Sequence, residues 1–235
     1  MFGHHDDTNY GIGWEGDEGR SDVKSVCGDY PAVISFDLGH IELGDTMSLD
    51  KVPFTKIRKE ILNQYKRGGM SSLSWHLRNP LTGGDSWDVS DTTVVKSILP
   101  GGANHEKFTG WVSKVSAFIN SLQTEEGVKV PVLFRPWHEH TGSWFWWGEK
   151  LCTPEEYKAL WHITVDILRN DGVDNALYAY SPGSEPQDTA QYLKRYPGDE
   201  LIDLIGFDTY QFERDTYLAN LEKSLAIVDS IGKVH

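Results

Sequence analysis

The 235-residue sequence has no cluster of lysine and arginine, no long apolar run and only two cysteines. Its 22 basic and 35 acidic residues leave a net charge of −13, so the chain offers no basic surface on which nucleic acid would bind. No stretch of about 18 apolar residues occurs, and we therefore expect no membrane span. These absences favour a neutral or cationic ligand.

Three local signals are also missing. Met1-Phe2-Gly3-His4 lacks the charged and apolar regions of a signal peptide, so the leader of a secreted form would lie outside this sequence. Cys27 and Cys152 are too far apart in sequence for a metal motif, and either a disulfide or two buried thiols is compatible with them. No glycine-rich phosphate fingerprint follows any expected strand, which argues against a nucleotide-binding sheet.

Aromatic residues, by contrast, are abundant, and several lie in loop-like segments beside glycine and aspartate. They make up 12% of the chain and include 9 tryptophans and 10 tyrosines. Core packing explains any single tryptophan, but an indole in a loop also suits a sugar-binding cleft, since the apolar face of a pyranose stacks on it. We expect Trp87, in the proline- and glycine-rich loop 78–88, to line such a cleft.

The segment 130–148 carries the strongest signal. It opens with an apolar, β-branched run that predicts a buried strand, and Arg135, His138 and Glu139 follow where the run stops. Trp144 and three more aromatic residues come next. Burial beside aromatic rings favours the protonated form of a carboxyl group, which can then act as an acid near neutral pH. A simple Glu139–Arg135 pair with core tryptophans explains this gathering at one strand end less well.

Apolar periodicity predicts strands that alternate with helices. Strands are expected at the N-terminus, over 32–38, 70–77, 176–181 and 201–207, from residue 130 onwards, and again at 233–235, whereas residues 11–20 are expected to form a loop. A helix starts after Pro53, and Thr153, Pro154 and Glu156 predict a capped start of another. The inner helix faces are expected to be Phe54, Ile57, Ile61 and Tyr65; Phe108, Trp111, Val112, Val115, Phe118, Ile119 and Leu122; Tyr157, Leu160, Trp161, Thr164, Ile167 and Leu168; and Leu218, Leu221, Leu225 and Val228.

This alternation predicts an α/β fold with a parallel sheet, either a barrel or a doubly wound sheet. Polar residues follow the strands at their carboxyl ends, and in a (β/α)8 barrel those ends share one face, so that distant residues meet in one pocket. The residues at these ends are His4, Asp37, His76, His138, Glu139, Ser181, Asp208 and Tyr210.

Six motifs are spread over the whole chain. They are GHHDD at 3–7, YGIGW at 10–14, GRSDVKSVCGDYPAV at 19–33, DLGHIE at 37–42, RPWHEHTGSWFWWG at 135–148 and IGFDTY at 205–210. Together they resemble glycoside hydrolase family 26, whose members are chiefly endo-β-1,4-mannanases on a (β/α)8 TIM barrel. The resemblance implies a secreted endo-1,4-β-mannosidase that cleaves internal bonds of β-mannan without a cofactor. It also implies a retaining mechanism with two carboxylates about 5 to 5.5 Å apart.

The resemblance further implies a role for individual residues. Glu139 corresponds to the general acid/base, and His138 to the neighbour that shapes the sugar site at the cleavage point. Trp144 corresponds to the aromatic platform there, and Tyr210 to the tyrosine that hydrogen-bonds the nucleophile. The remaining expected substrate contacts are His76, Asp208 and Trp87.

The family's nucleophilic glutamate lies on the seventh barrel strand, which would begin near His235. We therefore expect residues 1–235 to be a single catalytic domain cut at both ends, with about six of eight β/α units and the nucleophile outside the chain. Two unpaired strand edges would make the isolated chain poorly stable or prone to associate, and we expect little or no glycosidase activity from it.

Three alternatives remain open. A relative in the same family would cleave β-1,3-xylan or mixed-linkage β-glucan, and a carbohydrate-binding protein would use the aromatic residues without catalysis. A metal-dependent hydrolase would use His4, His76 and His138, although HEH lacks the helical HExxH spacing and we expect no metal. His5, Asp6 and Asp7 cannot all converge with His4, because neighbours on an extended chain alternate between faces. No functional role is expected for His105, His162 or His235.

Overall fold

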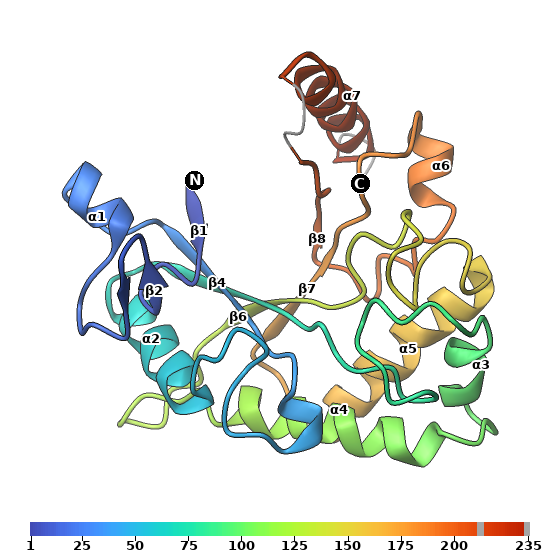
Figure 1. Ribbon diagram of the computed structural model, residues 1–235, viewed down its shortest axis with the longest axis horizontal. Coiled ribbons are helices and arrows are strands. Elements are labelled where there is room, and N and C mark those ends of the chain that lie inside the picture. Colours follow the sequence, from blue (N-terminus) through green and yellow to red (C-terminus); the bar gives the residue numbers. More distant parts are fainter. Residues whose placement is uncertain (211–213, 233–235) are drawn as a thin grey trace. The chain divides into compact units, whose positions relative to one another are not determined.

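The computed structural model describes residues 1–210 and 214–232. Six strands form one sheet, in which the pairs β1–β4, β4–β5 and β7–β8 are parallel. Their order in the sheet follows the order of the chain, which confirms the predicted parallel α/β fold. The sheet strands are β1 (Gly3–His5), β4 (Val33–Asp37), β5 (Met70–Ser74), β6 (Val132–Arg135), β7 (Ala176–Tyr180) and β8 (Leu204–Ile205) (Figure 1).

The residues fall into two compact units. Unit 1 comprises 1–77, 110–134 and 168–177, and unit 2 comprises 78–109, 135–167 and 178–235. Of the expected site residues, His76 belongs to unit 1, whereas Glu139 and the others belong to unit 2.

In unit 1, helix α2 (Phe54–Lys66) packs against β4 and β5 (Figure 1). Ile57 and Ile61 are fully buried, as predicted. Tyr65, predicted to face inward, is exposed, and Gln64 is buried instead. The Gln64 amide donates, at 2.9 Å, to the Pro31 carbonyl just before β4. A buried side chain thus provides the hydrogen-bond donor that this backbone carbonyl needs. Apolar periodicity does not anticipate a buried amide of this kind.

Two long helices confirm the predicted apolar stripes. Helix α4 (His105–Asn120) carries six of the seven predicted positions and Leu122 follows its end, and all seven are buried. Helix α5 (Pro154–Asn170) begins with the predicted capping box: the Glu156 N–H donates to the Thr153 hydroxyl at 3.1 Å, and the Thr153 N–H donates to the Glu156 carboxylate at 2.9 Å. On its inner face Ile167 is half-buried and the other predicted positions are buried.

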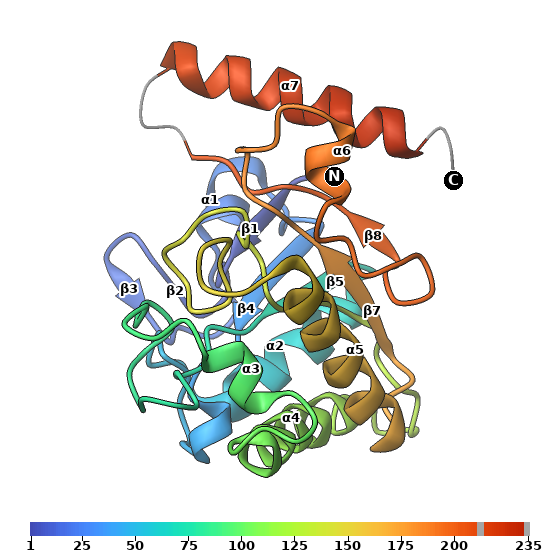
Figure 2. The same ribbon diagram turned by 90° about the vertical axis from the view of Figure 1, so that its right-hand side faces the viewer.

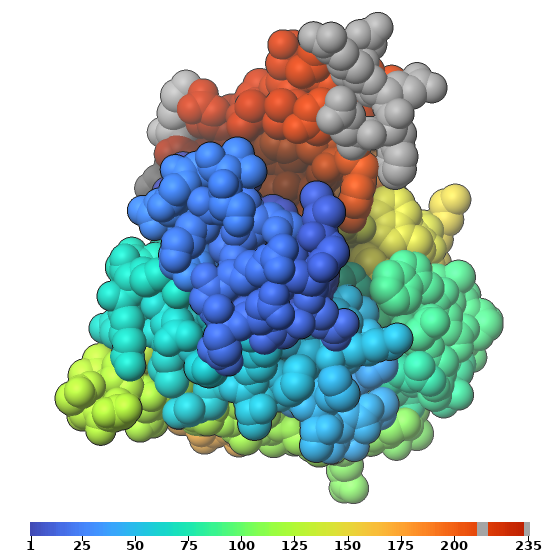
Figure 3. Space-filling model, turned by 60° about the vertical axis from the view of Figure 1, so that its left-hand side comes forward, coloured from blue at the N-terminus to red at the C-terminus, as the bar shows by residue number. Residues whose placement is uncertain are grey.

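The sequence patterns do not predict the short elements. The expected loop over residues 11–20 contains a small antiparallel ribbon, which the Asp22 carboxylate fastens by accepting from the Trp14 indole at 2.7 Å. Figure 3 shows this N-terminal segment in blue on the surface of unit 1. Elements of two to six residues are too short to display a period. They are β2 (Tyr10–Gly11), β3 (Trp14–Glu15), α1 (Asp22–Cys27), η1 (Ile41–Leu43), α3 (Val94–Ile98) and α6 (Thr189–Leu193).

Helix α7 (Arg214–Gly232) turns a different face inward from the one predicted. Leu218 and Leu225, expected on the inner face, are 43% and 52% exposed. Apolar residues occupy more than one face of this helix, and its packing against α6 (Figure 2) decides which face is covered. The buried positions are Ser224, Ile227 and Ile231.

Two sheet strands are shorter than predicted. β5 ends at Ser74 rather than at residue 77, and β8 comprises two residues rather than 201–207. After β5 the chain enters the loop that carries His76. After β8 the backbone keeps two hydrogen bonds to the chain that follows β7, from the Gly206 N–H to the Tyr180 carbonyl at 2.9 Å and from the Asp208 N–H to the Pro182 carbonyl at 2.7 Å. The strand expected at 233–235 lies outside the described residues.

Both cysteines are free thiols, so of the two alternatives the disulfide is wrong. Cys152 is buried and Cys27 is exposed, so the alternative of two buried thiols holds for Cys152 alone. Within residues 1–210 and 214–232, no helix has both the length and the apolar character that a membrane crossing requires.

Candidate active site

The chain turns sharply directly after β6, and Glu139 lies in this turn. Trp137 and Glu139 both have a φ of 55°, in the left-handed region that residues other than glycine seldom adopt. Each costs roughly 1–2 kcal/mol, so the turn persists because the surrounding structure fixes it. The strand does not continue through His138 and His140, which removes the regular alternation that a metal site on HEH would need.

Three hydrogen bonds fix the turn. The Tyr157 hydroxyl donates to the Trp137 carbonyl at 2.7 Å, and the Trp147 indole N–H donates to the His138 carbonyl at 2.9 Å. The Glu139 N–H donates to the carbonyl that follows β7 at 2.8 Å. The turn is therefore held at three peptide units, by Tyr157 of α5, by Trp147 and by the chain that follows β7.

The Glu139 carboxyl group receives two hydrogen bonds. Glu139 is buried, with 6% of its surface exposed. The Trp144 indole N–H donates to Oε2 at 2.9 Å, and the Tyr210 hydroxyl donates to Oε1. Partial burial, and then the Glu139 carboxylate, raise the pKa of Tyr210, so the hydroxyl keeps its proton and remains a donor. Tyr210, expected to bond the nucleophile, thus contacts the expected acid/base.

A cavity of about 380 Å³ opens beside this carboxyl group, within the range of small-molecule sites. Indole, phenol, carboxylate and hydroxyl groups face it, which is the mixture that suits a polar ring with one apolar face. Its lining comprises Glu139, Trp144, Gly183, Ser184, Glu185, Asp208, Tyr210, Thr216 and Asn220.

Asp208 lies in the same cavity, where its carboxylate forms an ion pair. Both of its carboxylate oxygens accept from Arg135, at 3.0 and 2.9 Å, and Oδ2 also accepts from the Ser181 hydroxyl at 2.6 Å. Arg135 therefore pairs with Asp208 rather than with Glu139, and the simple Glu139–Arg135 pair is wrong. These hydrogen bonds hold the Asp208 carboxylate in one orientation at the cavity.

The sequence reasoning missed Glu185. This exposed carboxylate lines the cavity and accepts from the Thr141 hydroxyl at 2.6 Å, while the same hydroxyl accepts from the Gly183 N–H at 2.8 Å. The signal that would have found it is the polar run after β7, the same strand-end rule that located the other residues.

Two other expected site residues belong to an aromatic cluster in unit 2. His138 is 2% exposed, with its ring 5.5 Å from Phe145 and 6.1 Å from Trp147. Trp87 is half exposed, and its ring lies 5.4 Å from Phe145. Among the residues that the structure describes, the cavity lining does not include either of them. Both instead contact the ring of Phe145, the residue after Trp144.

His76 is held by Asp37 in unit 1. Its Nδ1 lies 2.6 Å from the Asp37 carboxylate, which also accepts from the Ser74 hydroxyl at 2.6 Å. Burial opposes ionisation of Asp37, but the hydrogen bonds from His76, Ser74 and Gly39 outweigh it and hold the pKa of Asp37 well below its usual range. This pair fixes the orientation of the imidazole at the end of β5.

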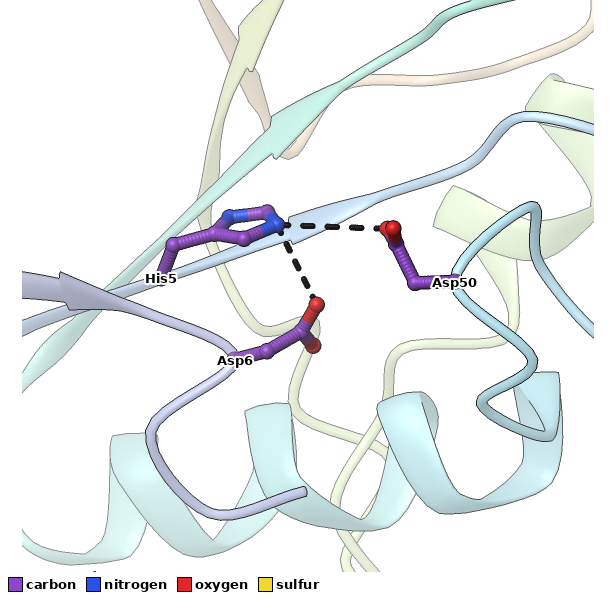
Figure 4. A group of neighbouring side chains, drawn as sticks. All are labelled: His5, Asp6 and Asp50. Atoms are coloured by element: carbon purple, nitrogen blue, oxygen red, sulfur yellow. Dashed lines mark ion pairs between the residues drawn. The ribbon is translucent and has the colours of Figure 1, made fainter. Parts of the chain in front are cut away.

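The adjacent residues of the N-terminal motif form separate pairs, as expected from the alternation of an extended chain. His4 lies 3.2 Å from Asp7, whereas His5 Nε2 lies 3.1 Å from Asp6 and 4.0 Å from Asp50 (Figure 4). Burial lowers the pKa of His5, but Asp50 and Asp6 outweigh it and raise that pKa to about 10. A protonated imidazole has no lone pair for a metal ion, so the group in Figure 4 is best described as an ion-paired cluster.

The parallel strand order and the carboxyl-bearing cavity beyond the strand ends define an α/β protein of the (β/α)8 class. The model of glycosyl hydrolase family 26 matches residues 1–229, and the chain belongs to this family. The predicted barrel class is thereby confirmed, with six barrel strands in the part of the chain described.

Solved structures and curated relatives agree with this family. A family 26 β-mannanase structure from Bacteroides ovatus matches with a TM-score of 0.99 and 63% identity, covering 100% of this chain and 68% of that one. An endo-β-1,4-mannanase double mutant from Cellulomonas fimi matches with a TM-score of 0.90 and 34% identity, covering 99% and 53%. A mannan endo-1,4-β-mannosidase of Bifidobacterium adolescentis is 38% identical over 89% of this chain, which spans about a fifth (21%) of that protein.

Proposed function

We propose that residues 1–235 act within a single catalytic domain of a secreted endo-β-1,4-mannanase, with Glu139 as the general acid/base. The observation that supports this role is the position of the Glu139 carboxyl group. It is buried, receives hydrogen bonds from Trp144 and Tyr210, and faces a cavity of about 380 Å³. The similar proteins named as mannanases supply the substrate class.

In the proposed reaction Glu139 donates its proton to the departing glycosidic oxygen and later removes a proton from the attacking water. A second carboxylate, the proposed nucleophile, attacks the sugar and forms the covalent intermediate. Trp144 stacks on the sugar, and Asp208 and Tyr210 bind its hydroxyl groups. Trp87 and His138 support this surface from their contacts with Phe145, and the substrate contact expected of His76 stays a prediction. No cofactor takes part, and the polymeric substrate calls for action outside the cell.

The full-length protein carrying Glu139→Ala tests this role. Loss of the general acid should lower kcat/KM on mannan by roughly 100- to 10,000-fold. An aryl β-mannoside with a strongly acidic leaving group needs no protonation, so its first step should persist, and added azide should accelerate turnover and give a mannosyl azide. Glu149→Ala, at an exposed surface carboxylate paired with Lys194, is the matched control.

A carbohydrate-binding protein without catalysis would behave differently. Its binding of mannan would not depend on hydrolysis, and neither the wild type nor the Glu139→Ala protein would release reducing sugar. Turnover of mannan, β-1,3-xylan and lichenan by the wild type separates the substrate alternatives, because the cleaved linkage and the 2-hydroxyl orientation differ among them. Faster hydrolysis of xylan or lichenan than of mannan would refute the proposed substrate.

A further inference from the structure

Arg195 is a buried cation whose partners are mainly backbone groups. It follows α6, is 3% exposed, and donates to the carbonyls of Trp147 at 3.1 Å, Cys152 at 3.3 Å and Gly148 at 3.5 Å. In the described parts of the chain no carboxylate forms an ion pair with it. A buried charge is costly unless it is compensated, so its position calls for a structural reason.

The Cys152 sulfur also accepts from the guanidinium, at 2.9 Å, and Tyr157 adds a further contact. The Arg195 guanidinium lies 4.5 Å from the centre of the Tyr157 ring, within the range of a cation–π contact. The guanidinium therefore contacts two aromatic residues at once, Trp147 at its carbonyl and Tyr157 at its ring face. Lysine has one compact ammonium group and no planar face, so it would not reproduce this set of contacts.

These same two aromatic residues hold the turn that carries Glu139. The Tyr157 hydroxyl binds the Trp137 carbonyl, and the Trp147 indole binds the His138 carbonyl. Those carbonyls belong to the two residues directly before Glu139, whose own φ of 55° needs support from its surroundings. A chain of contacts thus runs from Arg195 through Trp147 and Tyr157 to the turn of Glu139, although Arg195 is not part of the cavity lining.

We propose that Arg195 is a positioning residue that holds the acid/base carboxyl group of Glu139 in place through Trp147 and Tyr157. The inference rests on the proposed function of Glu139. If it is correct, weakening these contacts should impair proton donation before it impairs sugar binding, because Trp144, Asp208 and Tyr210 remain in the cavity.

The test uses the full-length protein with Arg195→Lys and Arg195→Met, and Lys194→Met as control at an exposed neighbour. The readout is kcat/KM for aryl β-mannosides of graded leaving-group acidity, with KM and the folded fraction measured in parallel. A misplaced acid should cost roughly 10- to 100-fold on poor leaving groups and much less on activated ones, with KM nearly unchanged. Lys194→Met should match the wild type.

An equal loss across all leaving groups, no loss, or failure of both Arg195 variants to fold would overturn the proposal and leave Arg195 a role in stability alone. Glu139→Ala measured on the same substrates separates the two hypotheses. If Glu139→Ala lacks the leaving-group dependence, the proposed function fails. If Glu139→Ala shows it and the Arg195 variants do not, only the positioning role fails.

Discussion

At the level of single residues, Trp144 has an exposed ring face and an indole N–H, and the two can be tested separately. It is 39% exposed at the cavity, where its ring face is available to a sugar, and its N–H donates to Glu139 at 2.9 Å. Gly142 lies so close to this indole that a Cβ there would come within 2.2 Å of it, so glycine leaves room for the ring. In the proposed reaction the ring face and the N–H therefore bear on different kinetic constants.

Trp144→Phe keeps an aromatic face and removes the N–H. A hydrogen bond to a charged group contributes about 1.5–3 kcal/mol, so we expect kcat on manno-oligosaccharides to fall about tenfold or more, with a small change in KM. Trp144→Ala should in addition raise KM, because the stacking surface is lost. Steady-state kinetics of both variants distinguish the contributions, and identical constants for the two would show that the N–H plays no part.

The cavity residues that directly follow a strand could be predicted from the sequence. Glu139, Trp144, Asp208 and Tyr210 follow apolar strand runs and do meet in one cavity. Arg195 was not predictable, because its contacts are to backbone carbonyls that only the folded chain brings together. The Tyr210 hydrogen bond to Glu139 also depends on tertiary placement, which spacing along the sequence does not encode.

At the level of elements, the long helices were predictable and the short ones were not. A stripe of six apolar positions fixes the inner face of α4, because no other face of that helix is as apolar. In α7 the apolar residues are spread over more than one face, and neighbouring packing selects Ile227 and Ile231 over Leu218 and Leu225. Periodicity settles orientation only where one face is much more apolar than the rest.

The ends of β4 and β5 are joined by Asp37, and this link should make stability depend on pH. Asp37 accepts from Ser74 and His76 at 2.6 Å and from the Gly39 N–H at 2.7 Å. Its pKa is lowered in the folded state, so its ionised form stabilises the fold above the unfolded value of about 4. That contribution is lost as pH falls below about 4 towards the folded pKa.

Asp37→Asn should therefore lower the free energy of unfolding at pH 7 by about 2 kcal/mol. Denaturant titrations over a pH series should show the gap from wild type narrowing only below about pH 4. Asp171→Asn, at an exposed position, is the matched control and should leave both the stability and its pH dependence unchanged. A gap that is constant from neutral to acidic pH would contradict the link through the ionised carboxylate.

At the level of the whole molecule, the net charge of −13 bears on which partners can approach. A neutral polysaccharide gains nothing from long-range charge, so the binding energy has to come from stacking and hydrogen bonds inside the cavity. Charge instead discriminates among partners, because it repels polyanions and attracts cations. The ionic atmosphere screens both effects over about 10 Å at 0.1 M salt.

The activity on neutral manno-oligosaccharides should accordingly change by less than about twofold between ~0.01 and ~1 M NaCl. The same oligosaccharide carrying a cationic end group should bind more tightly at low salt and lose that advantage as salt rises, since only its charge feels the acidic surface. Duplex DNA should show no binding in a mobility-shift assay even at low salt, where a basic surface would bind it most tightly. The neutral oligosaccharide and its cationic derivative share every sugar contact, so the difference between their affinities isolates the electrostatic contribution. DNA binding, or a steep salt dependence of activity on the neutral oligosaccharide, would contradict recognition by stacking and hydrogen bonding.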